Sequence, residues 1–269
     1  MKASSAIGLV IGALGIAMGA TMEGSSVMAV MNPSAMLIVL VGTFGAVMTG
    51  TSMGAVKNIP SLFKKAFSSE PPDLNGRVQE LVRYAEQARR DGLLALDEQL
   101  AGIEDPYTRK GLQLVVDGTD PDLVADVLEA ENDAMRKRHS AGTQPFEKAG
   151  GYAPTMGIIG TVFGLVHVLS NLSRPETLGP SISAAFIATL LGISSANIVY
   201  LPIAARLKQL SQEELHFRAM TLEGILAIQA GDNPRVVAEK LMAYVPPGER
   251  PTEEEAAAAA EAAKAEKAA

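Results

Sequence analysis

Cysteine is absent from this sequence. The chain therefore cannot form a disulfide, use a thiolate nucleophile, or bind zinc or an iron–sulfur cluster through cysteine. The three histidines lie far apart, and neither an HExxH zinc motif nor a GxxxxGK[ST] phosphate-binding loop occurs. These absences favour a protein that is not an enzyme and that holds no metal or cofactor.

Positive charge is also scarce. The 269 residues contain 23 lysines and arginines against 30 acidic residues, so the formal net charge is -7. A general nucleic-acid-binding protein needs a basic surface for the phosphates. The composition therefore argues against nucleic acid as a partner.

Charged residues of either sign are nearly missing from two segments, 1–56 and 149–205. Their only charged residues are Lys2, Glu23, Arg174 and Glu176. A charge at the centre of a bilayer costs about 2.5–3.5 kcal/mol on the insertion scale. A soluble domain gains nothing from this segregation of charge, whereas a membrane protein requires it. The sequence therefore predicts an integral membrane protein.

Four apolar runs are long enough to cross a membrane, which takes about 20 helical residues. We expect spanning helices at about 4–21, 33–54, 153–171 and 181–204. The segment between the second and third spans is rich in charge and has apolar residues at helical spacing, with no extended strand pattern. The predicted fold is an all-α integral membrane protein with four transmembrane helices and a large helical cytoplasmic domain between helices 2 and 3.

Lysine and arginine beside the spans predict the orientation. They gather at one end of the spans, at Lys57, Lys64, Lys65, Arg136, Lys137, Arg138, Lys148, Arg206 and Lys208. The opposite connections, 22–32 and 172–180, contain Arg174 alone. We therefore expect a multi-pass protein with both termini in the cytoplasm. A signal peptide cleaved near Ala17-Met18-Gly19 is the alternative for the first run.

These boundaries divide the chain into five parts. Residues 1–56 form transmembrane helices 1 and 2, 57–148 a cytoplasmic helical domain, 149–205 transmembrane helices 3 and 4, 206–250 cytoplasmic helices, and 251–269 a low-complexity tail to which we assign no function. In the cytoplasmic parts, Gly92 is expected to end one helix, and Asp120-Pro121 and Asn233-Pro234 each to begin one.

The predicted spans contain no Asp, Glu, Lys or Arg. An ion path across a membrane usually uses a charged or titratable group. His167 is the one candidate for such a group. It is interpreted equally well as a polar residue packed among its neighbours. A carboxylate for ion conduction therefore has to come from a partner.

Hydroxyls and prolines are what the third and fourth spans do contain, at Pro154, Thr155, Thr161, Thr189, Ser194 and Pro202. Each proline removes a backbone hydrogen bond and can free a carbonyl toward water or an ion. The alternative is that the threonines bond to their own helix and the prolines only kink it. Glycines at helical offsets in the spans indicate that these helices pack closely against other helices.

Several separated motifs resemble the MotA/PomA family of flagellar stator subunits. They are FEKAGGYAPTMGIIGTVFGL at 146–165, LGP at 178–180, ATLLG at 188–192, LPIA at 201–204 and ARRDGLLALD at 88–97. The resemblance extends over about residues 1–245, with the motifs in the family's order. It implies an ion-driven subunit of the flagellar motor in the bacterial cytoplasmic (inner) membrane.

The resemblance also implies partners. Five copies would form a ring around the paired helices of a MotB or PomB subunit, which binds peptidoglycan and supplies the ion-carrying Asp. Ion passage would neutralise that Asp and rotate the ring against the rotor switch protein FliG. One charge that crosses 100 mV releases about 2.3 kcal/mol, which is an adequate driving force.

Matched by motif, the family's functional residues fall on this chain in three groups. The ion path would use Thr161, Thr189, Pro154 and Thr155. The coupling prolines would be Pro154 and Pro202. The rotor-facing charges would be Arg89, Arg90, Asp97 and Glu98. The family usually has glutamate at position 97, so the role of Asp97 can be shared with Glu98.

Two points stay open on the sequence. An ExbB/TolQ-type energiser of outer-membrane transport is the alternative function, although those relatives have three spans. An independent transporter or membrane enzyme is a third hypothesis. The transported ion is expected to be H⁺ rather than Na⁺, because Ala188 stands where sodium-driven members carry an extra hydroxyl.

Overall fold

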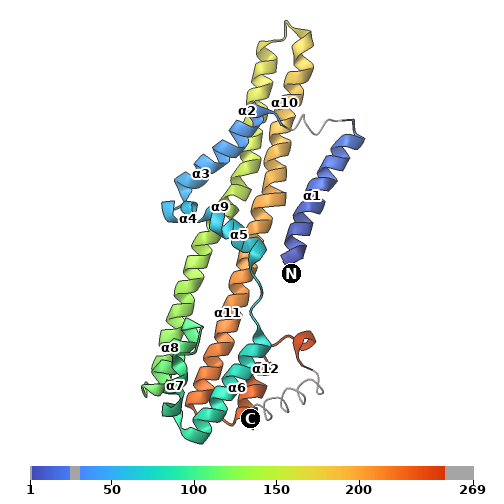
Figure 1. Cartoon of the computed structure of the whole chain (residues 1–269). Helices are drawn as coiled ribbons and strands as arrows, with labels where there is room; N and C mark the ends of the chain where they lie inside the picture. Colours follow the sequence, from blue (N-terminus) through green and yellow to red (C-terminus); the bar gives the residue numbers. More distant parts are fainter. Residues whose placement is uncertain (1, 25–30, 252–269) are drawn as a thin grey trace. The chain divides into compact units, whose positions relative to one another are not determined.

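A computed structural model of the chain describes residues 2–24 and 31–251 (Figure 1). These residues form helices and turns, and no strand occurs among them. This confirms the all-α class. The helical elements in chain order are α1 (Lys2–Met22), α2 (Pro33–Met36), η2 (Leu37–Val41), α3 (Gly42–Gly50), α4 (Met53–Lys57), α5 (Ile59–Ser68), α6 (Leu74–Asp91), η3 (Leu93–Leu96), α7 (Asp97–Leu100), α8 (Pro106–Val116), α9 (Pro121–Ser170), α10 (Pro175–Ser194), η4 (Ser195–Tyr200), α11 (Leu201–Gln229), α12 (Pro234–Met242) and η5 (Pro247–Glu249). The predicted low-complexity tail lies outside the described residues, apart from Pro251.

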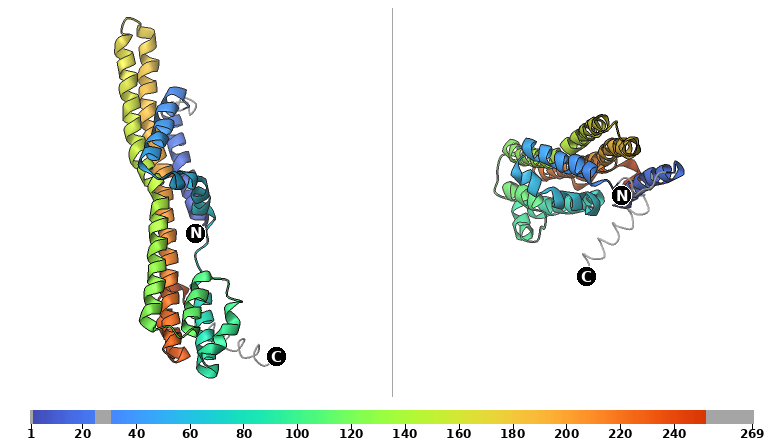
Figure 2. Two further views of the ribbon diagram at one scale, coloured as in Figure 1. Left: turned by 90° about the vertical axis from the view of Figure 1, so that its left-hand side faces the viewer. Right: turned by 90° about the horizontal axis from the view of Figure 1, so that it is seen from above.

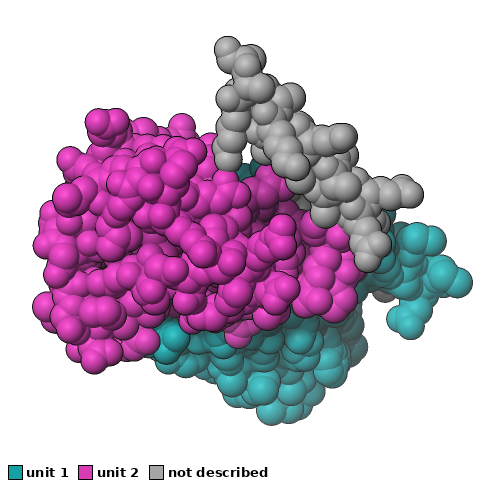
Figure 3. Space-filling view, turned by 90° about the horizontal axis from the view of Figure 1, so that it is seen from below, with its two compact units in different colours: residues 1–70, 136–211 teal, residues 71–135, 212–269 magenta. Residues whose placement is uncertain are grey.

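Packing divides the chain into two compact units (Figure 3). Unit 1 comprises Met1–Glu70 and Arg136–Ser211, and unit 2 comprises Pro71–Met135 and Gln212–Ala269. Both units thus combine segments that are distant in sequence, and α9 and α11 contribute residues to each. The boundaries expected from the sequence follow charge instead of packing, so residues 57–70 and 136–148 pack with the apolar helices of unit 1.

Three helical runs among the described residues are long and apolar enough to cross a membrane. They are Pro33–Gly50, Pro121–Ser170 and Pro175–Gln229. A further apolar helix, Ala6–Met22, is shorter. The runs correspond to the second, third and fourth predicted spans, and the shorter helix to the first.

The second span starts where the sequence predicts and ends earlier. Asn32 caps it by accepting hydrogen bonds from the backbone N–H groups of Ser34 (3.0 Å) and Ala35 (3.2 Å). The run ends at Gly50 instead of residue 54, because Thr51 is extended (φ −132°, ψ 157°). The hydroxyl of Ser52 then caps the separate helix α4.

The third span is the last part of a much longer helix. α9 has 50 residues and continues through Pro145 and Pro154, whereas the sequence predicts a start near residue 153 (Figure 2). A proline removes one hydrogen bond from a helix but leaves those on either side. The expected boundary marks a change of polarity, which does not stop the backbone from being helical.

The fourth span is also longer than predicted. α10 begins at Pro175, in place of residue 181, and the helix continues through η4 into α11. In η4 the helical turn widens, and the N–H of Leu201 bonds to the carbonyl of Ala196 five residues back. This wide turn lies immediately before Pro202, whose missing N–H disturbs regular helical bonding.

The core of unit 2 is formed by apolar side chains from α6, η3, α7, α8, α9, α11 and α12. Among its fully buried members are Leu81, Leu112, Leu128, Ile225 and Leu241. Burying a leucine or isoleucine side chain stabilises a fold by about 1.5–3 kcal/mol. This core holds the helices that carry the charged residues described below.

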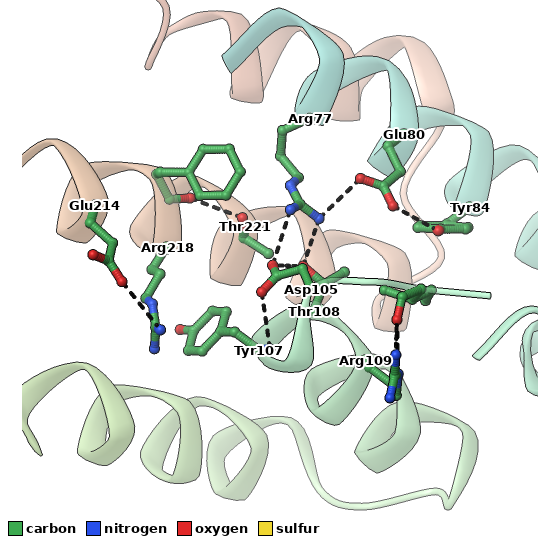
Figure 4. Close-up of polar contacts among 12 residues, drawn as sticks. Arg77, Glu80, Tyr84, Asp105, Tyr107, Thr108, Arg109, Glu214, Arg218 and Thr221 are labelled. Atoms are coloured by element: carbon green, nitrogen blue, oxygen red, sulfur yellow. Dashed lines mark hydrogen bonds and ion pairs between the residues drawn. The ribbon is translucent and has the colours of Figure 1, made fainter. Parts of the chain in front are cut away.

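A buried ionic network crosses the same unit (Figure 4). The guanidinium of Arg77, 9% exposed, donates to Thr108 Oγ1 (2.7 Å) and Asp105 Oδ2 (3.0 Å) and pairs with Glu80 (3.0 Å). It also stacks over the ring of Phe217, 4.7 Å from the centroid. These contacts join α6 to the start of α8 and to α11.

Candidate functional site

Two threonine hydroxyls meet between α9 and α10. Thr161 and Thr189, one from each helix, are hydrogen-bonded to one another through their Oγ1 atoms. The carbonyl oxygen of Gly157 lies within hydrogen-bond distance of both hydroxyls, at 3.2 Å from Thr161 Oγ1 and 3.3 Å from Thr189 Oγ1, and each hydroxyl donates its single proton to one acceptor at a time. Thr161 has a further acceptor in the carbonyl of Ala185 at 3.1 Å. The two residues thus form a compact group of oxygen atoms, the threonine cluster, with Gly157 and Ala185.

Glycine at position 157 allows this approach. A Cβ atom there would lie 2.8 Å from the carbonyl oxygen of Ala188 and 2.9 Å from the Cα of Thr189. Gly160, Gly164 and Gly192 face the opposite helix at similarly short range. Because both atoms that crowd position 157 are backbone, a side chain there would have to push the helices apart. The glycine pattern noted in the sequence therefore serves contact within the chain at these positions.

The other members of the predicted ion path do not join this cluster. The hydroxyl of Thr155 is exposed and donates to the carbonyl of Tyr152 at 2.8 Å, one turn back in its own helix. Pro154 is half-buried inside α9. Pro202 lies on α11 immediately after the wide turn η4 and lines a cavity between helices.

The chemistry available to the threonine cluster is that of neutral oxygen atoms. Hydroxyls and carbonyls can hydrogen-bond to a carboxyl group or replace part of the hydration shell of a cation. They cannot bind and release a proton as a carboxylate does. No Asp, Glu, Lys or Arg occurs in the sequence between Lys148 and Arg174 or between Glu176 and Arg206. The cluster therefore needs an acid from elsewhere to move ions.

His167 has no place in the threonine cluster. Its ring is exposed, and its backbone carbonyl accepts a hydrogen bond from Asn171 Nδ2 at 2.8 Å. It borders a half-open cavity of about 390 Å³, together with Ser34 and Ser181. The structure places this histidine at an exposed position beside the cavity instead of a packed one.

The predicted rotor-facing residues lie on a second feature, in unit 2, where α6 turns into η3 and α7. Arg89 and Arg90 lie in the last turn of α6, and Asp97 and Glu98 begin α7; all four are exposed. Gly92 makes the turn possible with φ at +89°, a conformation that glycine adopts without strain. The structure thus brings the four charges onto one helical hairpin, the charged hairpin of residues 89–98.

Buried contacts hold this hairpin in shape. Leu96 and Leu100 are 1% and 5% exposed and belong to the core of unit 2. Gln87 donates to the carbonyl of Ala95 at 3.1 Å and accepts a hydrogen bond from Gln99. The charged side chains therefore project from a backbone that is fixed from within.

Asp91 is the residue that sequence reasoning missed. Its carboxylate pairs with Arg90 through three contacts of 2.8–3.0 Å. The hydrogen bonds lower the pKa of Asp91 and raise that of Arg90. Arg90 thus has a partner on its own helix end, and the adjacency of the two residues was the only sequence signal for it.

Comparisons with known proteins assign the chain. Residues 6–89 match the profile of the motility protein A N-terminal region, and residues 99–220 match that of the MotA/TolQ/ExbB proton channel family. Motility protein A of Bacillus subtilis (strain 168) is 37% identical over 254 residues, 93% of each chain. The chemotaxis protein PomA of Vibrio alginolyticus is 36% identical over 94% of this chain and 99% of its own.

Solved structures agree. The structure of C. jejuni MotAB matches with a TM-score of 0.88 at 29% identity, over 93% of this chain and 98% of the other. The flagellar MotAB stator complex from Bacillus subtilis matches with a TM-score of 0.84 at 36% identity, over 89% and 94%. The N-terminal match favours the motility branch over the ExbB/TolQ-type energiser. The chain belongs to the MotA/TolQ/ExbB proton channel family, which is a channel family and not an enzyme family, and is a flagellar stator subunit of the motility protein A type.

Proposed function

We propose that this stator subunit conducts ions only in complex with a second, peptidoglycan-binding subunit of the MotB or PomB type, which supplies a membrane-embedded Asp. The observation that carries the proposal is the threonine cluster, a half-buried polar group between the apolar parts of α9 and α10, which contain no acidic residue from Lys148 to Arg174 or from Thr177 to Arg206. Solved structures similar to this chain include complexes named MotAB, which supports a partner of that type.

In this proposal Thr161 and Thr189 line the ion path beside the partner's carboxyl group. Their hydroxyls can donate to the carboxylate while it is charged and accept from it once it is protonated. The ion is H⁺ and not Na⁺, because Ala188, next to Thr189, adds no oxygen ligand. Pro154 and Thr155 stand about two turns before Thr161 on the same helix, nearer the cytoplasmic end.

Pro154 and Pro202 couple the partner's charge state to movement. Each interrupts the hydrogen-bond ladder of a helix that extends from the membrane part into unit 2. A helix is easier to bend where a bond is already missing. Neutralisation of the partner's Asp then shifts the helices and turns the ring.

The charged hairpin is the surface that pushes the rotor. Arg89, Arg90, Asp97 and Glu98 are exposed on a backbone held by buried leucines, which suits the transmission of force to the switch protein FliG. Charge complementarity favours a specific approach and rapid release at such a surface. Asp97 and Glu98 share one role at neighbouring positions.

The assembly that fits these roles is a ring of five chains around a partner dimer, in the bacterial inner membrane. Each chain crosses it four times, with α1 as the first span, and both termini are cytoplasmic. Apolar side chains exposed on α9 and α10 support contact with lipid or with other copies; they include Ile158, Val162, Phe163, Phe186 and Leu190.

The test is ion flux in reconstituted vesicles under an imposed membrane potential. We expect proton flux from the chain together with its partner and none from the chain alone or from a complex in which the partner's Asp is replaced by Asn. Flux from the chain alone would contradict the proposal. Arrest of swimming in sodium-free buffer would overturn the choice of H⁺ as the ion, while the proposed need for the partner subunit would stand.

A further inference from the structure

A second cavity lies among α1, α5, η4 and α11 in unit 1. Its volume is about 340 Å³, within the usual range for small-molecule sites. The lining is mostly apolar. It includes Gly8, Gly12, Phe67, Asn197, Pro202 and Arg206. None of the assigned ion-path residues borders it, and of the two coupling prolines Pro202 does.

One charged side chain opens onto this apolar space. Arg206 lines the cavity and is only 8% exposed. No acidic residue occurs among the described residues of the lining. Arg206 has a contact within the protein, and its guanidinium carries five N–H groups, so it can also hold a phosphate in the planar, two-bonded way typical of arginine.

Two glycines leave room on the α1 side. A Cβ at Gly8 would meet no atom within 4 Å, and one at Gly12 would touch only Ile198, at 3.8 Å. Positions 8 and 12 therefore contribute no side chain that would fill the groove along α1. In the proposed topology these glycines lie two to three helical turns inside the membrane from the cytoplasmic N-terminus, at the depth of acyl chains.

α5 forms another wall, and its pattern is that of a helix lying at a membrane surface. Ala66 is buried and Phe67 half-buried on the inner side, packed near Ile203 and Leu207. Lys64 and Lys65 on the other side are exposed. Basic residues at the cytoplasmic surface of a membrane attract anionic lipids.

We propose that this cavity is a binding site for one anionic phospholipid of the cytoplasmic leaflet, with its phosphate at Arg206 and an acyl chain along Gly8 and Gly12. A buried cation, an apolar groove and surface lysines are the three features that such a lipid requires at once. At this site the lipid, instead of protein side chains, fills the space between α1 and the helices α5 and α11. It rests on the membrane placement proposed above and not on the ion path.

The experiment uses the complex of the chain with its partner, purified in detergent, stripped of lipid and titrated with phosphatidylglycerol or phosphatidylcholine. Native mass spectrometry counts the bound lipids. We expect up to one phosphatidylglycerol per chain to bind, and phosphatidylcholine to bind at least fivefold more weakly, which is about the effect of one basic residue at a membrane surface.

Two variants test the two ends of the site. Arg206→Gln should weaken phosphatidylglycerol binding by about fivefold, and Gly8→Leu should abolish binding by filling the groove. Their controls are Lys208→Gln, which removes a charge from an exposed side chain outside the lining, and Gly15→Leu, whose Cβ also has open space but which does not line the cavity. Both controls should bind lipid as the wild type does.

Three results would overturn the site: equal binding of both lipids, undiminished binding in Gly8→Leu, or equal losses in variants and controls. If the Arg206→Gln complex does not assemble, lipid binding by the wild type and by Gly8→Leu still tests the site. A cavity filled by a helix of a neighbouring copy would appear as a wild-type complex that binds no phosphatidylglycerol. Such a complex would still conduct protons, which separates this failure from failure of the ion path.

Discussion

At the scale of single residues, the paired hydroxyls of Thr161 and Thr189 allow a sharp test of the ion path. Thr189→Val keeps the shape of the side chain and removes its hydrogen bonds to Thr161 and to the carbonyl of Gly157. A hydrogen bond to a charged group contributes about 1.5–3 kcal/mol. We therefore expect proton flux through the complex to fall by about tenfold or more.

The matched control is Thr189→Ser, which restores a hydroxyl and should recover most of the flux. The readout is the same vesicle assay, with swimming speed as the check in cells. Equal loss in the serine variant would show that the methyl group, and therefore packing, is what the position needs. Full flux in the valine variant would remove Thr189 from the ion path.

Tyr107 gives unit 2 a dependence on high pH. It is 1% exposed and accepts a hydrogen bond from Asn132 at 2.9 Å, and burial raises its pKa to about 12 from 10.0. The folded state therefore keeps its proton while the unfolded state loses it. Stability is fully present below pH 10 and falls between about pH 10 and 12, by about 1–2 kcal/mol.

Thermal unfolding of the purified complex between pH 9 and 12 measures this effect. Tyr107→Phe cannot ionise, so its melting temperature should fall less steeply over that range than the wild type's. At pH 7 the variant should be slightly less stable, because Asn132 loses its acceptor. Parallel pH profiles for the two proteins would show that Tyr107 ionises alike in both states.

The sequence predicts the identity of these residues better than their partners. A resemblance of motifs marks Thr161 and Thr189, but their contact with each other and with the carbonyls of Gly157 and Ala185 depends on how the consecutive helices α9 and α10 pack. Asp91 was overlooked for the same reason, since an acid beside Arg90 on a charged helix end is ordinary until its geometry is known.

At the scale of elements, close approach of α9 and α10 depends on Gly157. Gly157→Ala would place a Cβ within 2.9 Å of backbone atoms of Ala188 and Thr189. Overpacking of this kind costs about 1–3 kcal/mol. The helices should separate, the threonine cluster should open, and flux should fall although no functional side chain is altered.

Gly151→Ala is the control, because a Cβ at Gly151 meets no atom within 4 Å. It makes the same chemical change six residues away in the same helix. We expect normal flux and an unchanged melting temperature for it. If the two variants behave alike, helix propensity and not contact explains the effect of position 157.

The limits of helix prediction here have one physical cause. The starts at Pro33, Pro121 and Pro234 and the end at Gly92 are foreseen because capping and proline chemistry are local. The uninterrupted extent of α9 through Pro145 and Pro154 is not fixed by the sequence, because polarity changes along this helix while helicity does not. Charge patterns locate the bilayer, whereas packing decides where an element ends.

At the scale of the whole molecule, ion conduction and contact with the rotor belong to different parts of the chain. The spans lack acidic residues, and the hairpin carries the exposed charges. Unit 1 contains the threonine cluster and unit 2 the charged hairpin, and α9 and α11 contribute residues to both. Two units joined by continuous helices suit a protein in which ion passage in one part has to produce motion in the other.

The absence of cysteine makes the proposed topology directly measurable. Single cysteines at exposed positions can be labelled in intact cells with a membrane-impermeant maleimide. Glu23→Cys and Ser173→Cys, at the ends of α1 and α9, should react from outside once the reagent reaches the periplasm. Ala130→Cys, exposed on α9 in unit 2, should react only after the inner membrane is opened.

Four spans require this pattern, because α1 and the following run must form a hairpin whose turn is outside. Labelling of Ser173→Cys but not of Glu23→Cys in intact cells would leave three spans or fewer, since α1 would then not carry the chain across. Motility of each variant verifies that the subunit is assembled before labelling. Periplasmic reaction of Ala130→Cys would place the charged hairpin on the side away from the rotor and remove the basis for torque.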